Sequence, residues 1–322
     1  MKKKLSILLT FIIILSLFLS YLYYIDSIAS YSNLIMKPLN ESTIDDYFSD
    51  DIDKKSSAVK QIKESVLSDL GFESWMDYSE YMDVLVFPND INKDNKIDLL
   101  IGLNLSKDSG VIAIYKKTND DYEFYNSINN LGYITYISIL KNSDYIIVEE
   151  IIDEKLGGFF YDKDIRIFHS DNSTYNEVFR ESIEYESYYY EGWDNDKIEN
   201  PIWYKITESN IIDVIPNNKE IIIDVNKTIK LYESDEETTS IPSNFNLIKE
   251  QNIVINYYWS DKFKFFIQNE GKIIESGELV GIISLSNQFA DSLLNINESV
   301  YKIIDSQGKI RYLNKDSIEI IN

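Results

Sequence analysis

VLVFPNDINKDNKIDLLIGLNLSKDSGVIAIY, residues 84–115, consists of short apolar runs separated by polar turns. Each run is rich in Val, Ile and Leu, and the breaks between them contain Asp, Asn, Ser and Lys. Runs of about four to eight apolar residues bounded by turn-forming residues are typical of β-strands. We therefore predict three consecutive strands, at 83–87, 98–103 and 110–116.

The same pattern continues through most of the chain. The composition agrees with it, because 25 Tyr and 15 Phe suit a pleated, half-buried surface. Further strands are predicted at 133–140, 144–151, 164–169, 202–206, 211–215, 220–225, 228–232, 252–259, 262–268, 272–275, 279–284, 300–304 and 309–313. Short strands at this spacing are typical of a sandwich, a barrel or a propeller, so the predicted fold class is mainly β.

The segment before these strands is predicted to be helical. Apolar residues recur at helical spacing over 56–70, and Gly71 follows where a C-terminal cap belongs. The recurring positions are Val59, Ile62, Val66, Leu67 and Leu70. A second short helix is predicted over 73–81. Residues 26–54 are hydrophilic and crowded with aspartate near their end, which predicts an acidic spacer.

A polar break divides the strand-rich part of the chain. Residues 233–244, ESDEETTSIPSN, contain no apolar run, which is typical of a linker. We therefore predict a larger β domain with its leading helix over 55–232 and a small β domain over 245–322. The end of the small domain, YKIIDSQGKIRYLNKDSIEII at 301–321, resembles the closing strands of bacterial SH3-like domains.

The first 25 residues predict a membrane segment. Lysines fill positions 2–4, and residues 5–25 contain no charge. A helix of that length rises about 1.5 Å per residue and can cross a hydrocarbon core of about 30 Å. The lysines favour a cytoplasmic N-terminus and place the rest of the chain outside. The alternative is a secretory signal cleaved near Ala29, after the small-residue pattern Ser27-Ile28-Ala29.

Charge and cysteine content exclude several classes of function. The formal net charge is −23, so nucleic acid phosphates and anionic lipid head groups are repelled. The chain contains no cysteine, which excludes disulfides, thiolate metal sites and a cysteine nucleophile. His169 is the only histidine, and we expect it at the end of a strand rather than in a catalytic triad.

The turn between the first two predicted strands has the spacing of a calcium loop. Oxygen-bearing side chains occupy relative positions one, three, five and nine, namely Asp90, Asn92, Asp94 and Asp98. The carbonyl of Lys96 adds an oxygen at position seven, and a hard cation takes six to eight oxygens. Asn95 tolerates the left-handed backbone that such a turn needs. An EF-hand is excluded because Ile101 stands where the bidentate acid belongs. The alternative is a polar turn that binds nothing.

Residues 83–127 resemble a calcium-binding blade of the FG-GAP/VCBS type, which builds integrin-α-like β-propellers. The resemblance rests on Asp-x-Asn-x-Asp-Asn-x-x-Asp-Leu-Leu-Ile-Gly, with a strand before it, a strand at 110–115 and a fourth at 122–124. It implies that Asp90, Asn92, Asp94, Asp98 and the Lys96 carbonyl bind Ca²⁺. No second copy of the loop occurs, and a propeller typically has about four to eight blades. The predicted architecture over 55–232 is therefore propeller-like, either closed or incomplete.

A cluster of aromatic residues over 185–204 is a candidate binding surface. Exposed rings stack on sugars or dock partner proteins. The candidates are Tyr188, Tyr189, Tyr190, Trp193 and Trp203. The alternative is that strand alternation buries half of them.

These features predict a non-enzymatic, calcium-binding protein that is anchored in the membrane and exposed outside a bacterial cell. Its body serves recognition of, or attachment to, a surface glycan or protein. Two alternatives stay open: an envelope hydrolase acting on carbohydrate with paired carboxylates, and an accessory subunit of a membrane complex. A hydrolase needs a deep cleft with two facing carboxylates, whereas a binding module needs a shallow aromatic face.

Overall fold

The computed structural model describes residues 39–91, 93–119, 121–140, 143–155, 159–171, 174–193, 198–217, 220–285 and 300–321. The chain divides into two compact units, residues 1–76 and 77–322. The predicted membrane segment at 1–25 and the cleavage site near Ala29 lie outside the described residues. Within the described ranges, no helix is both long enough and apolar enough to span a membrane.

The described part of the first unit contains two α-helices. Its elements are the short strand β1 (Leu39–Asn40) and the helices α2 (Glu41–Tyr47) and α3 (Ile52–Asp69). Asn40 caps α2 by accepting the Thr43 amide at 2.9 Å. Asp51 caps α3 by accepting the Asp53 amide at 3.0 Å. The prediction of a spacer over 26–54 is wrong for its second half, because some of the polar residues that suggested it are helix caps.

The predicted helices at 56–70 and 73–81 are confirmed. Helix α3 buries residues of its predicted apolar stripe, including Ile62 and Val66. Gly71 has a φ of 72° and ends the helix: its amide bonds to the Ser68 carbonyl, and the Phe72 amide bonds to the Leu67 carbonyl. This is the Schellman arrangement that a glycine at this position permits. The second helix is the 3₁₀ helix η1 (Glu73–Tyr81).

The second unit begins with an antiparallel sheet in which each strand pairs with the next. Its strands β2 (Asp83–Asn89), β3 (Asp98–Ser106), β4 (Ser109–Lys117) and β5 (Asp121–Leu131) lie in the order β5-β4-β3-β2. The three strands predicted at 83–87, 98–103 and 110–116 are therefore confirmed.

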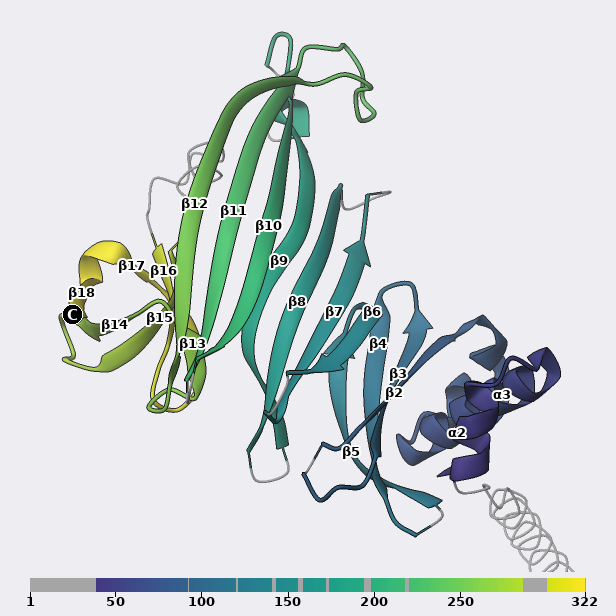
Figure 1. Ribbon diagram of the computed structural model, residues 1–322. Helices are drawn as coiled ribbons and strands as arrows, with labels where there is room; N and C mark the ends of the chain where they lie inside the picture. Colours follow the sequence, from purple (N-terminus) through teal and green to yellow (C-terminus); the bar gives the residue numbers. More distant parts are fainter. Residues whose placement is uncertain are drawn as a thin grey trace, which may run out of the picture. The chain divides into compact units, whose positions relative to one another are not determined.

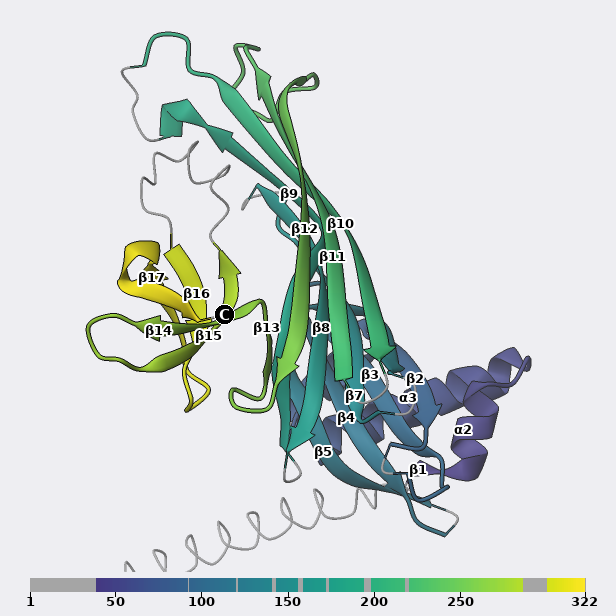
Figure 2. The ribbon, with the colours of Figure 1, turned by 60° about the vertical axis from the view of Figure 1, so that its left-hand side comes forward.

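A long antiparallel sheet follows, drawn in teal to green in Figure 1. Its strands are β6 (Tyr133–Ile139), β7 (Tyr145–Asp153), β8 (Phe160–Asp171), β9 (Thr174–Tyr190), β10 (Trp203–Asn217), β11 (Glu220–Ser234), β12 (Asn246–Ser260) and β13 (Phe265–Ile267). A one-turn 3₁₀ helix, η2 (Glu191–Trp193), follows β9. The eight strands pair in sequence order and curve into a half-barrel, which Figure 2 shows along its edge.

The half-barrel corrects the expected propeller. Residues 133–232 lie in one continuous sheet instead of forming further four-stranded blades. The reason is strand length: β9 has 17 residues and β10 and β11 have 15 each, so neighbouring strands keep pairing well beyond the length of a short strand. The overall fold remains mainly β, as predicted.

The segment 233–244, which was predicted to link two domains, does not separate domains. Strand β12 pairs with β11 from Glu233 opposite Asn246 to Ile222 opposite Tyr258, so this polar segment connects two neighbouring strands of one sheet. The small sheet begins only at Asn269. Its elements are β14 (Asn269–Ile273), β15 (Leu279–Leu285), β16 (Val300–Ile304), β17 (Ile310–Asn314), η3 (Lys315–Ser317) and β18 (Ile318–Ile321), and its strand order is β17-β16-β15-β14-β18.

Two apolar cores hold the second unit together. One core joins the four-stranded meander to the start of the half-barrel through Ile112 and Ile114 on β4 and Ile146 and Val148 on β7. The other joins the half-barrel to the small sheet, and it includes Phe266 on β13 and Ile283 on β15. The small sheet also has a core of its own around Val280 and Ile303.

Candidate functional site

The loop between β2 and β3 is a tight turn held by its own carboxylates. Asp90 accepts the backbone amides of Asp94 at 3.1 Å and Asn95 at 2.9 Å. Asp94 accepts the Lys96 amide at 2.9 Å. Asn95 has a φ of 68°, the left-handed backbone predicted for it, and Lys93 has a φ of 62°. Asn92 lies outside the described residues.

Asp98 ends this loop with a buried carboxylate. Its side chain is on β3 and the residue is 1% exposed. One carboxylate oxygen accepts the Lys117 amide at 2.9 Å. The other, Oδ2, is buried and makes no hydrogen bond of ordinary geometry among the described residues, although the Ile91 amide is near enough to lower the pKa of this carboxyl. Burial raises the pKa of Asp98, and the negative charges of Asp94 and Asp90 raise it further. No positive charge among the described residues outweighs these effects.

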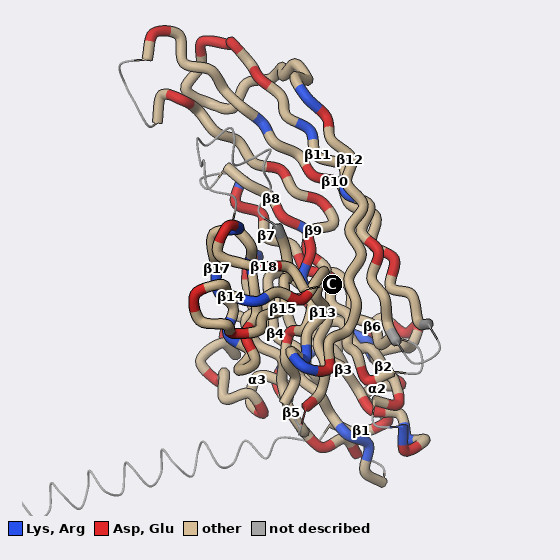
Figure 3. Tube along the Cα trace, turned by 90° about the vertical axis from the view of Figure 1, so that its left-hand side faces the viewer, with Lys and Arg blue, Asp and Glu red and all other residues tan. Residues whose placement is uncertain are grey.

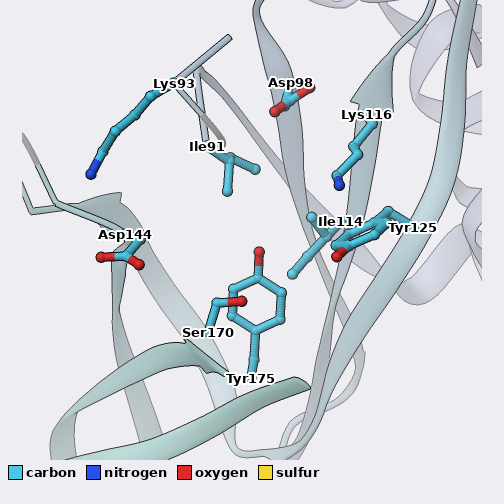
Figure 4. Close-up of a pocket in the computed structure, with 9 residues that line it drawn as sticks. All are labelled: Ile91, Lys93, Asp98, Ile114, Lys116, Tyr125, Asp144, Ser170 and Tyr175. Carbon is cyan, nitrogen blue, oxygen red and sulfur yellow. The ribbon is translucent and has the colours of Figure 1, made fainter. Parts of the chain in front are cut away.

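A small cavity of about 190 Å³ adjoins Asp98 (Figure 4). Residues from both large sheets line it, and Tyr175 of β9 points its hydroxyl from the floor towards Ile91 and Asp98. Lys116, which also lines the cavity, lies over the Tyr125 ring, 3.4 Å from its centre. Burial raises the pKa of Tyr175 to about 12, so its hydroxyl stays protonated and can donate a hydrogen bond.

The donor set of the loop fits a hard cation in part. Asp98 offers a partnerless buried oxygen, and Asp90 and Asp94 lie close enough for their charges to affect its pKa. Among the described residues, no three acidic or histidine side chains form a ready metal cluster. The predicted ligand set, however, also includes two groups of other kinds, the Asn92 side chain and the Lys96 carbonyl. The calcium site stays a prediction.

The aromatic residues predicted as a binding surface are largely packed together. Trp203 is fully buried, donates its indole N–H to the Thr238 carbonyl at 2.9 Å, and stacks on Tyr190 at 4.8 Å between ring centres. Tyr188 and Tyr189 are half-buried on β9. Trp193 is the most exposed of the five candidates, at 48%. The expectation of an exposed aromatic face is therefore wrong for Trp203, because strand pairing turns it inward.

A larger groove of about 790 Å³, which the sequence did not indicate, runs along the half-barrel. One part of it is lined by charged residues of β8, β9 and β11, namely Asp162, Asp164, Arg180, Glu181 and Lys227. A second part is lined by β12, and a third by Gln268 and by residues of the small sheet such as Ser284 and Lys302. We refer to this feature as the groove. Figure 3 shows how acidic and basic residues are interspersed along these strands.

Most charges in the groove are already paired. Arg180 donates through Nε to Asp164 at 2.6 Å. Lys227 Nζ lies 2.8 Å from Glu181 and 3.1 Å from Glu208. Tyr257 donates its hydroxyl hydrogen to Glu181 at 3.1 Å. These charges lie on neighbouring strands and satisfy one another across the sheet.

Two charged residues of the groove, Asp162 and Lys302, form no ion pair among the described residues. The Oδ1 of Asp162 is buried and has no hydrogen-bond partner in the part of the chain that the structure describes. Burial raises the pKa of Asp162 to about 7, and the nearby charge of Asp164 contributes to the rise. A cation beside Asp162 would favour the charged carboxylate and lower this pKa. In the sequence, Asp162, Asp164 and Arg166 are spaced two residues apart, a pattern that places charges on one face of a strand.

No protein-family model matches this chain, and no curated protein matches it.

Proposed function

We propose that this protein is a non-enzymatic recognition protein outside the cytoplasm, held at the membrane by residues 5–25, with a calcium ion in the loop between β2 and β3. The observation that carries the calcium part is Asp98, a buried carboxylate with a partnerless oxygen at the end of an Asp/Asn-rich turn. Burying such a group is costly unless a cation or a hydrogen bond compensates it.

The residues that would hold the ion are Asp90, Asn92, Asp94 and Asp98, with the Lys96 carbonyl. When bound, calcium supplies positive charge to carboxylates that otherwise repel one another. The ion would fix the connection between two paired strands. Its role is therefore stabilisation of the meander rather than chemistry on a substrate.

Calcium titration of the full chain tests this site. We expect calcium to raise the unfolding temperature and to give a calorimetric binding signal, because a ligand that binds only the folded state stabilises it. Asp98→Asn should abolish both effects. The matched control Asp108→Asn removes an exposed carboxylate from the next turn and should leave both unchanged. Absence of binding at millimolar calcium would remove the site.

The membrane location is tested separately from the calcium site. An unbroken apolar segment of 21 residues behind three lysines supports a retained anchor. N-terminal sequencing of the mature protein should return the lysine-rich start, and the body should be digested by protease added to intact cells. A mature chain that starts at Ser30 would indicate secretion, and a body protected in intact cells would contradict external exposure.

The alternative of a carbohydrate hydrolase has one supporting observation, the two carboxylates Asp162 and Asp164 in the groove. Asp164, however, is 2% exposed and bonded to Arg180, so it is poorly placed to contact a substrate. Only Asp162 remains with an uncommitted oxygen, whereas glycoside hydrolysis usually needs two carboxyl groups. Hydrolysis of envelope polysaccharides that Asp162→Asn abolishes would favour the enzyme over the binding protein.

A further inference from the structure

The half-barrel leaves a long strand edge unpaired. Strand β12 pairs with β11 along its length, but β13 covers it only at Tyr258, Trp259 and Ser260. From Glu250 to Tyr257, no strand of the described residues lies on the other side of β12. Every second residue of an edge strand directs its N–H and C=O outward, where they can pair with another chain.

This edge lacks the features that usually prevent pairing. Residues 251–257 read QNIVINY and contain neither a charge nor a proline. Proteins commonly protect an exposed edge with lysine, proline or a bulge. The irregularity in the pairing of β12 lies opposite Leu231 and Tyr232, before this segment. Val254 is 68% exposed within it. The segment is thus a long, β-prone edge that is open to strand addition.

The groove runs along this same edge. Residues Ile253, Val254, Ile255, Asn256 and Tyr257 all line it. Consecutive residues of a strand point to opposite faces, so a run of five in one wall means that the edge of β12 contributes to the lining. The small sheet lines the groove as well, through Ile283, Ser284 and Lys302. The groove beside the unpaired backbone is therefore lined by both β12 and the small sheet.

The charge in the groove selects the kind of chain that would fill it. Asp162 offers a buried carboxylate oxygen with no partner among the described residues, whereas Arg180 and Lys227 are already paired with acids and Lys302 lies on the small sheet. A lysine or arginine side chain in the groove would supply the missing positive charge. The strongly negative protein as a whole also attracts basic partners.

We propose that the groove binds an extended, basic peptide segment, which adds as a strand to the edge of β12 between Glu250 and Tyr257 and places a cationic side chain at Asp162. Backbone hydrogen bonds give affinity in this mode, and side-chain pockets give specificity. The inference rests on the proposed recognition function and is independent of the calcium loop.

A short peptide of alternating valine and lysine is the probe, titrated into the full chain in mild non-ionic detergent. We expect saturable binding with slowed amide exchange at residues 251–257. The same peptide with every second amide N-methylated keeps its charge but cannot donate those backbone hydrogen bonds. It should bind at least about tenfold more weakly. An acidic peptide of alternating valine and glutamate should not bind.

Two protein variants localise the charge contact. Asp162→Asn should weaken the basic peptide about tenfold, because it removes a charge-assisted hydrogen bond. Asp213→Asn makes the same charge change at an exposed position of β10 and should leave affinity unchanged. Equal binding of the N-methylated peptide would overturn the proposal by showing simple charge attraction. Self-association through 251–257, detected by sedimentation and amide exchange, would overturn it in favour of a second copy.

The two proposals fail separately. If calcium binds but the peptide does not, the calcium loop stands and the groove has no peptide ligand. If the peptide binds but calcium does not, recognition stands without the metal. Protease protection and N-terminal sequencing report on location regardless of either result.

Discussion

Asp98 and Asp162 are both carboxylates with one buried oxygen that has no partner among the described residues. They differ in what surrounds them. Asp98 ends a loop that holds two further aspartates, which suits a divalent ion, whereas Asp162 lies beside Asp164 in a groove of about 790 Å³. The same unmet requirement for positive charge thus supports a metal in one place and a basic side chain in the other.

The pKa of Asp162 predicts a stability that depends on pH. Its folded-state pKa is about 7, above the ordinary value of 3.8, so the folded state holds this proton more tightly than the unfolded state. The proton on Asp162 therefore contributes to the free energy of unfolding. This contribution is fully present below about pH 4 and is lost as pH rises through about 7. Thermal unfolding at pH 5, 6, 7 and 8 should show this loss, and Asp162→Asn should remove it.

The Asp162→Asn variant should therefore be more stable than the natural protein at pH 8, since amide replaces a buried charge. Asp213→Asn provides the control, because that carboxylate is exposed. An unchanged pH profile in Asp162→Asn would show that another group titrates.

At the scale of the strand, buried charges hold β7, β8 and β9 together. Arg166 on β8 contacts Glu150 on β7 at 3.1 Å and Glu177 on β9 at 2.6 Å. Glu150 is 1% exposed and also accepts the Gly132 amide at 2.9 Å. Removing one partner of a buried ion pair leaves an uncompensated charge, which is costlier than removing both.

We therefore expect Arg166→Met to destabilise the protein by about 3–5 kcal/mol. The control is Lys163→Met on the same strand, whose partner Glu149 is half-buried at the surface. A surface pair contributes about 0–1 kcal/mol, so this control should change stability little. Denaturant unfolding of both variants measures the change in the free energy of unfolding. Equal changes would show that the buried ion pairs of Arg166 stabilise the protein no more than the surface pair does.

The strands show where sequence patterns succeed and where they fail. The runs at 83–87, 98–103 and 110–116 are continuous apolar stretches, and strands form there. By contrast, the runs at 202–206 and 211–215 were separated by Glu208 and Asn210, yet both belong to β10. Glu208 meets Lys227, and Asn210 donates to the Ser182 carbonyl at 2.8 Å.

Strand β9 was missed for the same physical reason. Its first half alternates apolar residues with Glu177, Arg180 and Glu181, which read as a solvated segment. Each of these charges has a partner on another strand, 11 to 46 residues away in the sequence. The spacing of apolar residues within one segment cannot predict ion pairs with other strands. The groove was unpredictable on the same ground, whereas Asn95 and Gly71 were predictable because backbone geometry is local.

At the scale of the whole second unit, one apolar core connects the half-barrel to the small sheet. Phe266 is fully buried in it and packs against Trp259 at 5.4 Å and Tyr145 at 5.9 Å between ring centres. Ile283 and Ile304 of the small sheet belong to the same cluster. The two sheets should therefore lose structure together.

Phe266→Ala tests this coupling. Truncating a buried phenylalanine costs about 3–5 kcal/mol, so global stability should fall by that amount. Amide exchange should accelerate in β15 and β16 as well as in β12. Tyr312→Ala, which truncates an exposed ring of β17, is the control. Faster exchange confined to β12 and β13 would show that the small sheet is stable by itself.

The order of strand pairing affects how the polypeptide acquires its structure during synthesis. From β2 to β5, and again from β6 to β13, each strand has as its neighbour the one that left the ribosome just before it. Pairing between sequence neighbours closes short loops and is fast. In the described small sheet, the β14–β18 pair must wait for the last strand of the chain. A nascent chain can therefore zip up hairpin by hairpin, with each newest strand protecting the edge of its predecessor from aggregation.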